Sequence, residues 1–252
     1  MIGSFIKNLF TGVLPKLLFI IFLVLVVAGI VIIVSEIVSF HTSTYKKKTN
    51  KKSLLAIRLF NKGAIGEYLI YDALKKYEKK GAKFFFNLYV PKENGDSSEI
   101  DVVMVNGCGV YVFESKNYSG WIFGNSRDQY WTQSLRSGKG TVKNRFFNPV
   151  MQNAGHIKAL APILGDDVTF HSFIVFSNRC ELKKITVDNG KIKVLKRENL
   201  KSAVSSCEAE SEKTLGRDGI DRICSILSNF EHPDEATKQA HDTQVSNYNH
   251  RR

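Results

Sequence analysis

The strongest pattern in the chain is an unbroken apolar run near the N-terminus. Residues 17–34 read LLFIIFLVLVVAGIVIIV and contain no charged or polar side chain. As a helix this run reaches roughly 27 Å, at about 1.5 Å per residue, which nearly spans a bilayer core. It is apolar all round, unlike a buried helix of a soluble protein, and it is too long for a cleaved signal peptide. We therefore expect residues 1–40 to form an uncleaved N-terminal transmembrane anchor.

Positive charge is distributed unevenly around this run. Lys7 and Lys16 precede it, and the basic residues that follow it are Lys46, Lys47, Lys48, Lys51, Lys52 and Arg58. Because an excess of Lys and Arg marks the cytoplasmic side of a membrane segment, we predict a single-pass protein of the inner (cytoplasmic) membrane whose soluble part faces the cytoplasm. Residues 41–60 are expected to be a basic linker, either solvated or in contact with anionic lipid through Lys46, Lys47, Lys48, Lys51 and Lys52.

Beyond the linker, helical spacing of apolar residues predicts two helices. The first runs from residue 63 to Gly81, with Gly66 and Glu67 in its first turn. The second begins at the Asn148 cap and extends to residue 164. Its inward side chains are expected to be Val150, Ala154, Ile157, Leu160 and Ala161.

Short runs of β-branched and aromatic residues predict strands. They cover residues 83–90, 99–105, 109–116, 121–124, 129–135 and 169–177. The segment NGCG joins the second and third of these in a tight hairpin, and residues 184–195 read as another hairpin that turns at 188–190. Residues 137–145 are expected to be a basic, flexible loop and residues 209–229 a closing helix. The polar, aperiodic tail at 231–252 is expected to be disordered.

Composition limits the domain organisation and the partners. The 252 residues, 43% of them hydrophobic, suffice for one globular domain, which we place at residues 61–230. The net charge of +12 favours a polyanionic partner, either nucleic acid or anionic lipid. The four cysteines lie far apart without a CxxC pair, so neither a zinc site nor a disulfide framework is indicated.

Charged residues interrupt two of the predicted strands. Glu114 and Lys116 lie on one face at the end of an apolar strand, where an unpaired carboxylate would cost on the order of several kcal/mol. Asp101 lies between apolar residues in the preceding strand. A hairpin sets these strands side by side, so the two carboxylates can converge. Two carboxylates this close repel each other, and a bound divalent cation commonly offsets the repulsion. The other Glu-x-Lys triplets, at 78–80 and 181–183, fall on a helix and a loop, where exposed charge is common.

Several motifs stand in the order of a known family. They are GAIGE at 63–67, EIDVV at 99–103, GVYVFESKNYSG at 109–120, Trp131, and NPVMQ at 148–152. With these motifs, residues 63–163 resemble the nuclease-related domain (NERD) family, a branch of the restriction-endonuclease-like superfamily with the PD-(D/E)xK motif. The resemblance implies an α/β fold in which a restriction-endonuclease-like mixed central sheet is flanked by helices, here preceded by the transmembrane helix.

The same resemblance implies a site. Asp101 and Glu114 would bind a divalent metal, Mg²⁺ or Mn²⁺, and Lys116 would position or deprotonate the attacking water. Glu67 would reach the site from its helix as an accessory acid, and Gln152 would line the site from another helix. A metal ion suits phosphodiester cleavage because it lowers the pKa of bound water and neutralises the phosphoryl oxygens.

Simpler structural roles stay open for the charged residues. Asp101 and Glu114 could pair with Lys116 in a buried salt bridge that has no catalytic purpose. Glu67 could stabilise the positive end of its helix instead of taking part in a reaction. The sequence alone therefore leaves a structural ion-pair cluster as the rival of a catalytic site.

Structural roles are also open for the other polar and aromatic residues. Gln152 could be an ordinary hydrogen-bonding residue on a helix face. His156 and His171 are expected to be core or surface histidines, because Mg²⁺ prefers oxygen ligands. Trp131 is expected to pack in the core rather than to stack on a base.

These observations predict a membrane-anchored, metal-dependent nuclease-like protein that hydrolyses phosphodiester bonds, with DNA rather than RNA as the expected substrate. Two other classes stay open: a non-catalytic nucleic-acid-binding module that retains the nuclease fold, and a membrane scaffold that binds proteins or anionic lipid through its basic linker. The intact Asp, Glu and Lys set argues against a mere binder, because acidic groups that face phosphate weaken its binding.

Overall fold

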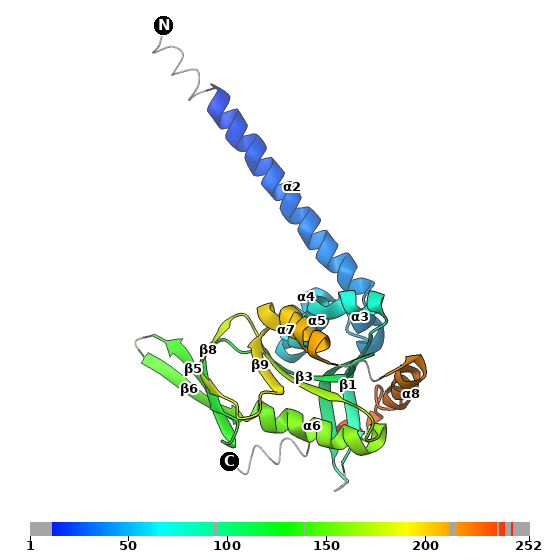
Figure 1. Ribbon diagram of the computed structural model, residues 1–252. Coiled ribbons are helices and arrows are strands. Elements are labelled where there is room, and N and C mark those ends of the chain that lie inside the picture. The colour runs from blue at the N-terminus through cyan, green and yellow to red at the C-terminus, as the bar shows by residue number, and fades with distance from the viewer. Residues whose placement is uncertain are drawn as a thin grey trace.

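The computed structural model describes residues 12–92, 95–138, 140–211, 215–235, 237–239 and 243. A long helix, α2 (Leu14–His41), projects from an α/β domain that contains two sheets (Figure 1). The apolar side chains of α2 are exposed on all sides, and Phe40 is its one buried residue. Among the described residues, α2 is the one helix long and apolar enough to cross a membrane. It contains the whole apolar run at 17–34.

The domain is built on two mixed sheets. The central sheet has the strand order β1-β2-β3-β7-β9, and the second sheet has the order β6-β5-β4-β8. The strands of the central sheet are β1 (Lys83–Pro91), β2 (Ser97–Asn106), β3 (Gly109–Lys116), β7 (Phe170–Phe176) and β9 (Ile192–Lys196). Those of the second sheet are β4 (Gly120–Asn125), β5 (Tyr130–Ser137), β6 (Gly140–Phe147) and β8 (Cys180–Thr186). In the central sheet β1, β2 and β3 are antiparallel neighbours, whereas β7 and β9 continue it in parallel.

Helices cover both faces of the central sheet. One face is covered by α3 (Thr44–Thr49), α4 (Leu54–Phe60), α5 (Lys62–Leu74), the 3₁₀ helix η2 (Lys75–Lys80) and α7 (Leu200–Glu210). The other face is covered by α6 (Pro149–Leu164) and α8 (Arg217–Ser228). The short 3₁₀ helix η3 (Arg197–Asn199) joins β9 to α7. The structure confirms the predicted α/β class, with helices around a mixed sheet and an apolar helix before it. It adds a second sheet to the central one.

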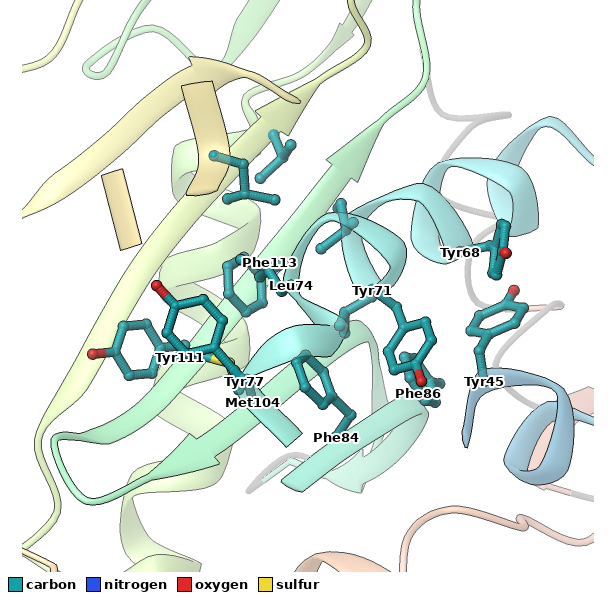
Figure 2. Packing of buried hydrophobic residues seen from close by; sticks show 14 of the residues in the cluster. Tyr45, Tyr68, Tyr71, Leu74, Tyr77, Phe84, Phe86, Met104, Tyr111 and Phe113 are labelled. Carbon is teal, nitrogen blue, oxygen red and sulfur yellow. The ribbon is translucent and has the colours of Figure 1, made fainter. Parts of the chain in front are cut away.

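Strand β3 is buried on both faces. Tyr111 and Phe113 pack into the largely aromatic cluster beneath α5, which Figure 2 shows from close by. Val110 and Val112 pack into the cluster beneath α6 and α8. Alternate side chains of a strand point to opposite faces, so a strand covered on both faces is apolar throughout. Glu114 is therefore a charged residue that continues a strand covered by helices on both sides.

The segment predicted as a basic linker folds against the domain. Ser43 and Ser53 cap α3 and α4, because each Oγ accepts a hydrogen bond from a backbone N–H of the first turn at 3.1 Å. Tyr45 of α3 is fully buried, and its ring centroid lies 4.9 Å from that of Phe86 in β1. Phe40, at the end of α2, joins the same cluster. This packing ties the end of α2 to the domain.

Four sequence predictions about secondary structure are wrong. Residues 181–183, expected in a loop, lie in the largely exposed strand β8. The predicted loop at 137–145 contains the turn and most of the second strand of the β5–β6 hairpin. Because β6 is largely exposed, its sequence lacks the alternation of apolar and polar residues that predicts a strand. Residues 184–195 are not a hairpin, because β8 pairs with β4 in the second sheet and β9 pairs with β7 in the central sheet. The predicted helix at 209–229 is replaced by the end of α7 and the separate helix α8. The predicted tail at 231–252 falls largely outside the described residues.

Helix α6 begins after the Asn148 cap as predicted but buries a partly different face. Ala154, expected to point inward, is exposed, whereas the polar residues Asn153 and His156 are buried. Asn153 Nδ2 donates a hydrogen bond to the backbone oxygen of Val112 at 3.0 Å. Partners in the sheet thus allow α6 to turn polar residues inward.

Candidate active site

The C-terminal end of β3 brings together the two charges that the sequence singled out. Lys116 Nζ donates a hydrogen bond to Glu114 Oε1 at 2.6 Å, so both side chains lie on one face of the strand. Glu114 is 1% exposed, whereas part of the Lys116 side chain reaches solvent. The carboxylate is thus enclosed, and its lysine partner is partly exposed.

Helix α6 supplies two further groups. Gln152 Oε1 accepts a hydrogen bond from Lys116 Nζ at 3.0 Å. His156 Nε2 lies 3.0 Å from Glu114 Oε2, and its Nδ1 lies 2.7 Å from Ser98 Oγ. Glu114 is therefore held from two sides, by Lys116 on one oxygen and by His156 on the other.

Asp101 approaches the same carboxylate from the neighbouring strand. The antiparallel register of β2 and β3 sets Asp101 opposite Glu114, and the backbone N–H of Ser115 donates to Asp101 Oδ2 at 2.8 Å. Strand β2 changes face here, since Ile100 packs into the cluster beneath α6 and Val102 into the cluster beneath α5. Asp101 lies at this change of face, between acidic groups from the two sides of the sheet.

Helix α5 contributes Glu67 from the other side. The helix begins at Lys62, so Glu67 lies in its second turn and not, as predicted, in its first. The helix can approach β3 closely because residue 66 is glycine; a Cβ on Gly66 would lie 2.5 Å from Ser115 Oγ. Glu67 is buried, and its Oε2 accepts a hydrogen bond from the hydroxyl of Tyr45 at 3.1 Å. A role at the helix end is therefore excluded for Glu67.

Two residues in contact with these acids, His156 and Tyr45, were not among the candidates from the sequence. His156 follows Gln152 by four residues, and residues with this spacing share one face of a helix. That spacing is a signal that could have identified it. Tyr45 lies in a six-residue helix among lysines, which is too short to show a helical period. No sequence signal marks Tyr45 as a partner of an acid.

Burial and mutual repulsion raise the pKa values of two acids. Burial raises the pKa of Glu67 to about 7, although the charge of Lys51 and the hydrogen bond from Tyr45 oppose this effect. Burial, followed by the charges of Glu114 and Glu67, raises the pKa of Asp101 well above its ordinary value. Glu67 therefore exchanges a proton near neutral pH, where general acids and bases work best.

Glu114 and Lys116 shift in the opposite sense. Burial alone would raise the pKa of Glu114, but the charge of Lys116 and the hydrogen bond with His156 outweigh it, and the pKa is lowered. Burial alone would lower the pKa of Lys116, but the charges of Glu114 and Asp101 raise it. At neutral pH the pair is therefore a carboxylate and an ammonium. In this state Lys116 donates hydrogen bonds and does not accept a proton.

The NPVMQ segment and Trp131 build the frame of the site. Asn148 Oδ1 accepts a hydrogen bond from Val150 N at 2.9 Å, and its Nδ2 donates to Asp128 O at 2.7 Å. These bonds fix the start of α6 against the turn between β4 and β5. Trp131 is fully buried and stacks on Phe176 with 6.1 Å between ring centroids. It packs in the core, as expected.

The lysines of the predicted linker have different surroundings. Lys48 Nζ lies 2.8 Å from Glu231 Oε1, so this side chain is directed at the domain. The charge of Lys51 acts on the buried acid of α5. Lys47 and Lys52 are exposed. Lys51 thus lies near the site, whereas Lys47 and Lys52 remain accessible to a partner.

The donor groups of the site suit a hard divalent cation. Asp101 and Glu114 offer carboxylate oxygens, and Mg²⁺ is commonly held by one or two carboxylates together with water and substrate phosphates. Burial raises the pKa of Asp101 most, and the charges of Glu114 and Glu67 add to this rise, which a bound cation would oppose. In the part of the chain that the structure describes, no three His, Cys, Asp or Glu side chains are already gathered as metal ligands. A metal would therefore rest on this carboxylate pair.

Comparison with known proteins relates the chain to a family. Residues 62–177 match the family model described as the nuclease-related domain. An uncharacterised protein from Bacillus anthracis is 30% identical over 186 residues, which cover 74% of this chain and 84% of that protein. No solved structure matches the chain. The region that matches the family model includes the strands and helices that carry all five candidate residues.

Proposed function

The chain belongs to the nuclease-related domain family, and we propose that it is a metal-dependent phosphodiesterase whose site is built on Asp101, Glu114 and Lys116. The observation that carries the proposal is the enclosed Glu114 carboxylate, 2.6 Å from Lys116 and opposite Asp101. A structural ion pair would need only two groups, and Asp101 adds a third titratable group, whose pKa is strongly raised. Clusters of titratable groups with shifted pKa values are typical of active sites.

Each residue has a distinct part in this proposal. Lys116, as an ammonium, donates to a phosphoryl oxygen or to the attacking water, and Gln152 fixes its position. His156 holds the second oxygen of Glu114 and so orients the carboxylate. Glu67, with its pKa near 7, holds or releases a proton in the working range of the site.

Asp101 and Glu114 would hold the metal ion, Mg²⁺ or Mn²⁺. Such an ion would lower the pKa of the attacking water and neutralise the charge that develops on the phosphoryl oxygens. Each carboxylate oxygen can accept more than one bond. The bonds that these oxygens accept from Lys116 and from the backbone N–H of Ser115 are therefore compatible with a ligand role.

We propose nucleic acid as the substrate, and DNA before RNA. The net charge of +12 favours a polyanion. The register of β5 and β6 places basic and aromatic residues on one face of the second sheet, namely Tyr130, Arg136, Lys143, Arg145 and Phe147. Cations suit phosphates and aromatic faces suit bases. DNA is placed first because the restriction-endonuclease-like superfamily, of which the family is a branch, takes its name from enzymes that cleave DNA.

We also propose that α2 crosses the inner membrane once and that the domain faces the cytoplasm. The support is the exposed apolar run at 17–34, which lies within the 28-residue helix α2, together with the excess of lysines after this run. The site would then act on nucleic acid close to the cytoplasmic surface of the membrane.

Two substitutions in the full-length protein test the phosphodiesterase. Glu114→Gln keeps the shape of the side chain but removes a ligand charge, so cleavage with Mg²⁺ should fall at least about 100-fold, roughly 3 kcal/mol in barrier. Its metal-free affinity for DNA should hold or improve, because a repelling charge is lost. Lys116→Ala should also abolish cleavage, yet it should weaken binding and flatten the salt dependence by a slope of about 0.9.

Glu181→Gln is the matched control, because Glu181 belongs to an exposed Glu-x-Lys triplet in which Lys183 Nζ lies 2.6 Å from its Oε2. This variant should cut like the parent. Full cleavage by both Glu114→Gln and Lys116→Ala would show that the pair is structural and that the proposal is wrong. Steep salt-dependent binding without cleavage by the parent would favour the non-catalytic nucleic-acid-binding module. Flotation with anionic vesicles, but no binding of nucleic acid, would favour the membrane scaffold.

A further inference from the structure

Helix α4 exposes large apolar side chains to solvent. Leu54 and Ile57 point into the core, as in an ordinary surface helix. The opposite side carries Phe60, Leu55 and Leu59, which are 85%, 66% and 62% exposed. A soluble helix would place polar residues at these positions. An exposed apolar patch of this kind marks a surface that meets a partner or a membrane.

The position of α4 along α2 identifies the partner. Arg58 of α4 forms an ion pair with Glu36 of α2 at 2.9 Å. Glu36 lies just after the apolar run at 17–34, at the level where a membrane core would end. Figure 1 shows α4 on the side of the domain from which α2 projects. The exposed face of α4 is therefore located at the depth of the lipid headgroups.

The end of α2 is held firmly enough to keep α4 at this depth. The ring of Phe40 is buried in the domain, with its centroid 5.1 Å from that of Tyr68 in α5. Lys75 Nζ donates a hydrogen bond to Ser39 Oγ at 2.6 Å. These contacts join the last two turns of α2 to the helices around α4. The domain and α2 therefore approach a membrane as one unit.

Charge near α4 also fits a membrane surface. Lys52 and Lys62, just outside the two ends of α4, are exposed, and Arg58 lies between them. Apolar residues flanked by Lys and Arg are typical of helices that lie in the headgroup region of anionic membranes. A water-soluble protein partner would not explain why the patch lies beside the end of a transmembrane run.

We propose that Leu55, Leu59 and Phe60 of α4 insert into the headgroup region of the same anionic bilayer that α2 crosses. This inference rests on the membrane anchoring proposed above. Asn61, which follows α4 directly, caps the helix that carries Glu67, since its Oδ1 accepts a hydrogen bond from Ala64 N at 2.8 Å. Insertion of α4 would thereby fix the orientation of the candidate active site relative to the membrane surface.

Tryptophan quenching in nanodiscs tests the proposal with the full-length protein. The discs contain phosphatidylcholine and phosphatidylglycerol, with bromine either near the headgroups or near the bilayer centre, and each disc holds one chain. Phe60→Trp and, as a second reporter, Leu59→Trp place the probe on α4, where exposure makes the change tolerable. Phe22→Trp reports on the middle of α2, and Val142→Trp on the exposed second sheet. The emission of Trp121 and Trp131 is subtracted by measuring the parent.

We expect shallow bromine to quench the added emission of Phe60→Trp and Leu59→Trp, deep bromine to quench that of Phe22→Trp, and neither to quench that of Val142→Trp. Quenching of Phe22→Trp without quenching of the α4 reporters would show that α2 crosses the membrane but that α4 does not insert into it, and would overturn this proposal. Blue-shifted but unquenched α4 reporters would show that another part of the same chain covers the helix instead of lipid, and would also overturn it. If Phe22→Trp is not quenched either, α2 does not cross the membrane and both proposals fail.

Discussion

Replacement of Glu67 by glutamine should stabilise the protein, and the gain should depend on pH. Burial raises the pKa of Glu67 to about 7 in the folded state, against 4.5 for the ordinary side chain. When the folded pKa is the higher one, the group contributes stability below the unfolded pKa, and this stability is lost as the pH rises through the folded pKa. Compared with a permanently neutral side chain, ionisation of Glu67 therefore lowers the free energy of unfolding by about 1 kcal/mol at pH 5 and about 3 kcal/mol at pH 8.

Glu67→Gln removes this titration and keeps a side chain of the same shape beside Tyr45, so the variant should exceed the parent in stability by these amounts. The assay is urea unfolding of the full-length protein in detergent, followed by the fluorescence of the buried Trp131 from pH 5 to pH 8. Glu210→Gln, on the exposed side of α7, controls for the loss of one negative charge. A gain in stability that is absent at pH 8, or equal at pH 5 and pH 8, would show that Glu67 does not have a raised pKa in the folded protein.

The same variant separates a functional acid from a structural one. Active sites often contain residues that lower the stability of the fold, so a buried acid that destabilises the protein in its charged form is a candidate functional group. Glu67→Gln should therefore be more stable at pH 8 and cleave more slowly. Unchanged cleavage by a more stable variant would remove Glu67 from the proposed machinery.

Three further predictions concern the metal, the membrane and the fold. Mg²⁺ at ten times its Kd should stabilise the parent by about 1.4 kcal/mol but not Asp101→Asn, and an equal thermal shift in both would remove the metal assignment. A fluorescent reporter fused to the C-terminus should emit and alkaline phosphatase fused there should stay inactive; active phosphatase would reverse the orientation. Gly66→Ala should lower the free energy of unfolding by about 1–3 kcal/mol, because its Cβ would lie 2.5 Å from Ser115 Oγ. Adding Ser115→Ala should restore part of this loss, and urea unfolding measures both effects. An unchanged stability of Gly66→Ala would contradict the close approach of α5 to β3.

The sequence was informative where a charge interrupts an apolar pattern. Glu114 and Asp101 could be singled out because both faces of their strands are buried, so that any charged residue stands out locally. The apolar run inside α2 is likewise a local pattern. Such features need no knowledge of tertiary contacts.

The rest depends on contacts between distant segments. In the sequence His156 is an ordinary polar residue of a helix, because its hydrogen-bond partner Glu114 lies 42 positions away. Tyr45 reaches Glu67 only because α3 packs on the central sheet. The polar strand β6 is stabilised by pairing with β5 rather than by burial, so its pattern resembles a loop. Adjacent strands β8 and β9 read as a hairpin, yet each finds its partner in a different sheet.

In the proposed function, the carboxylates of Asp101 and Glu114, with Lys116, support hydrolysis of phosphodiester bonds. The most direct test incubates the full-length protein in nanodiscs with labelled duplex, single-stranded, branched and RNA substrates, with Mg²⁺ or Mn²⁺ and with chelator. We predict metal-dependent cleavage of at least one DNA substrate, which chelator stops and Glu114→Gln reduces at least about 100-fold. Binding without cleavage of any substrate with either metal, or cleavage that Glu114→Gln leaves intact, would contradict it.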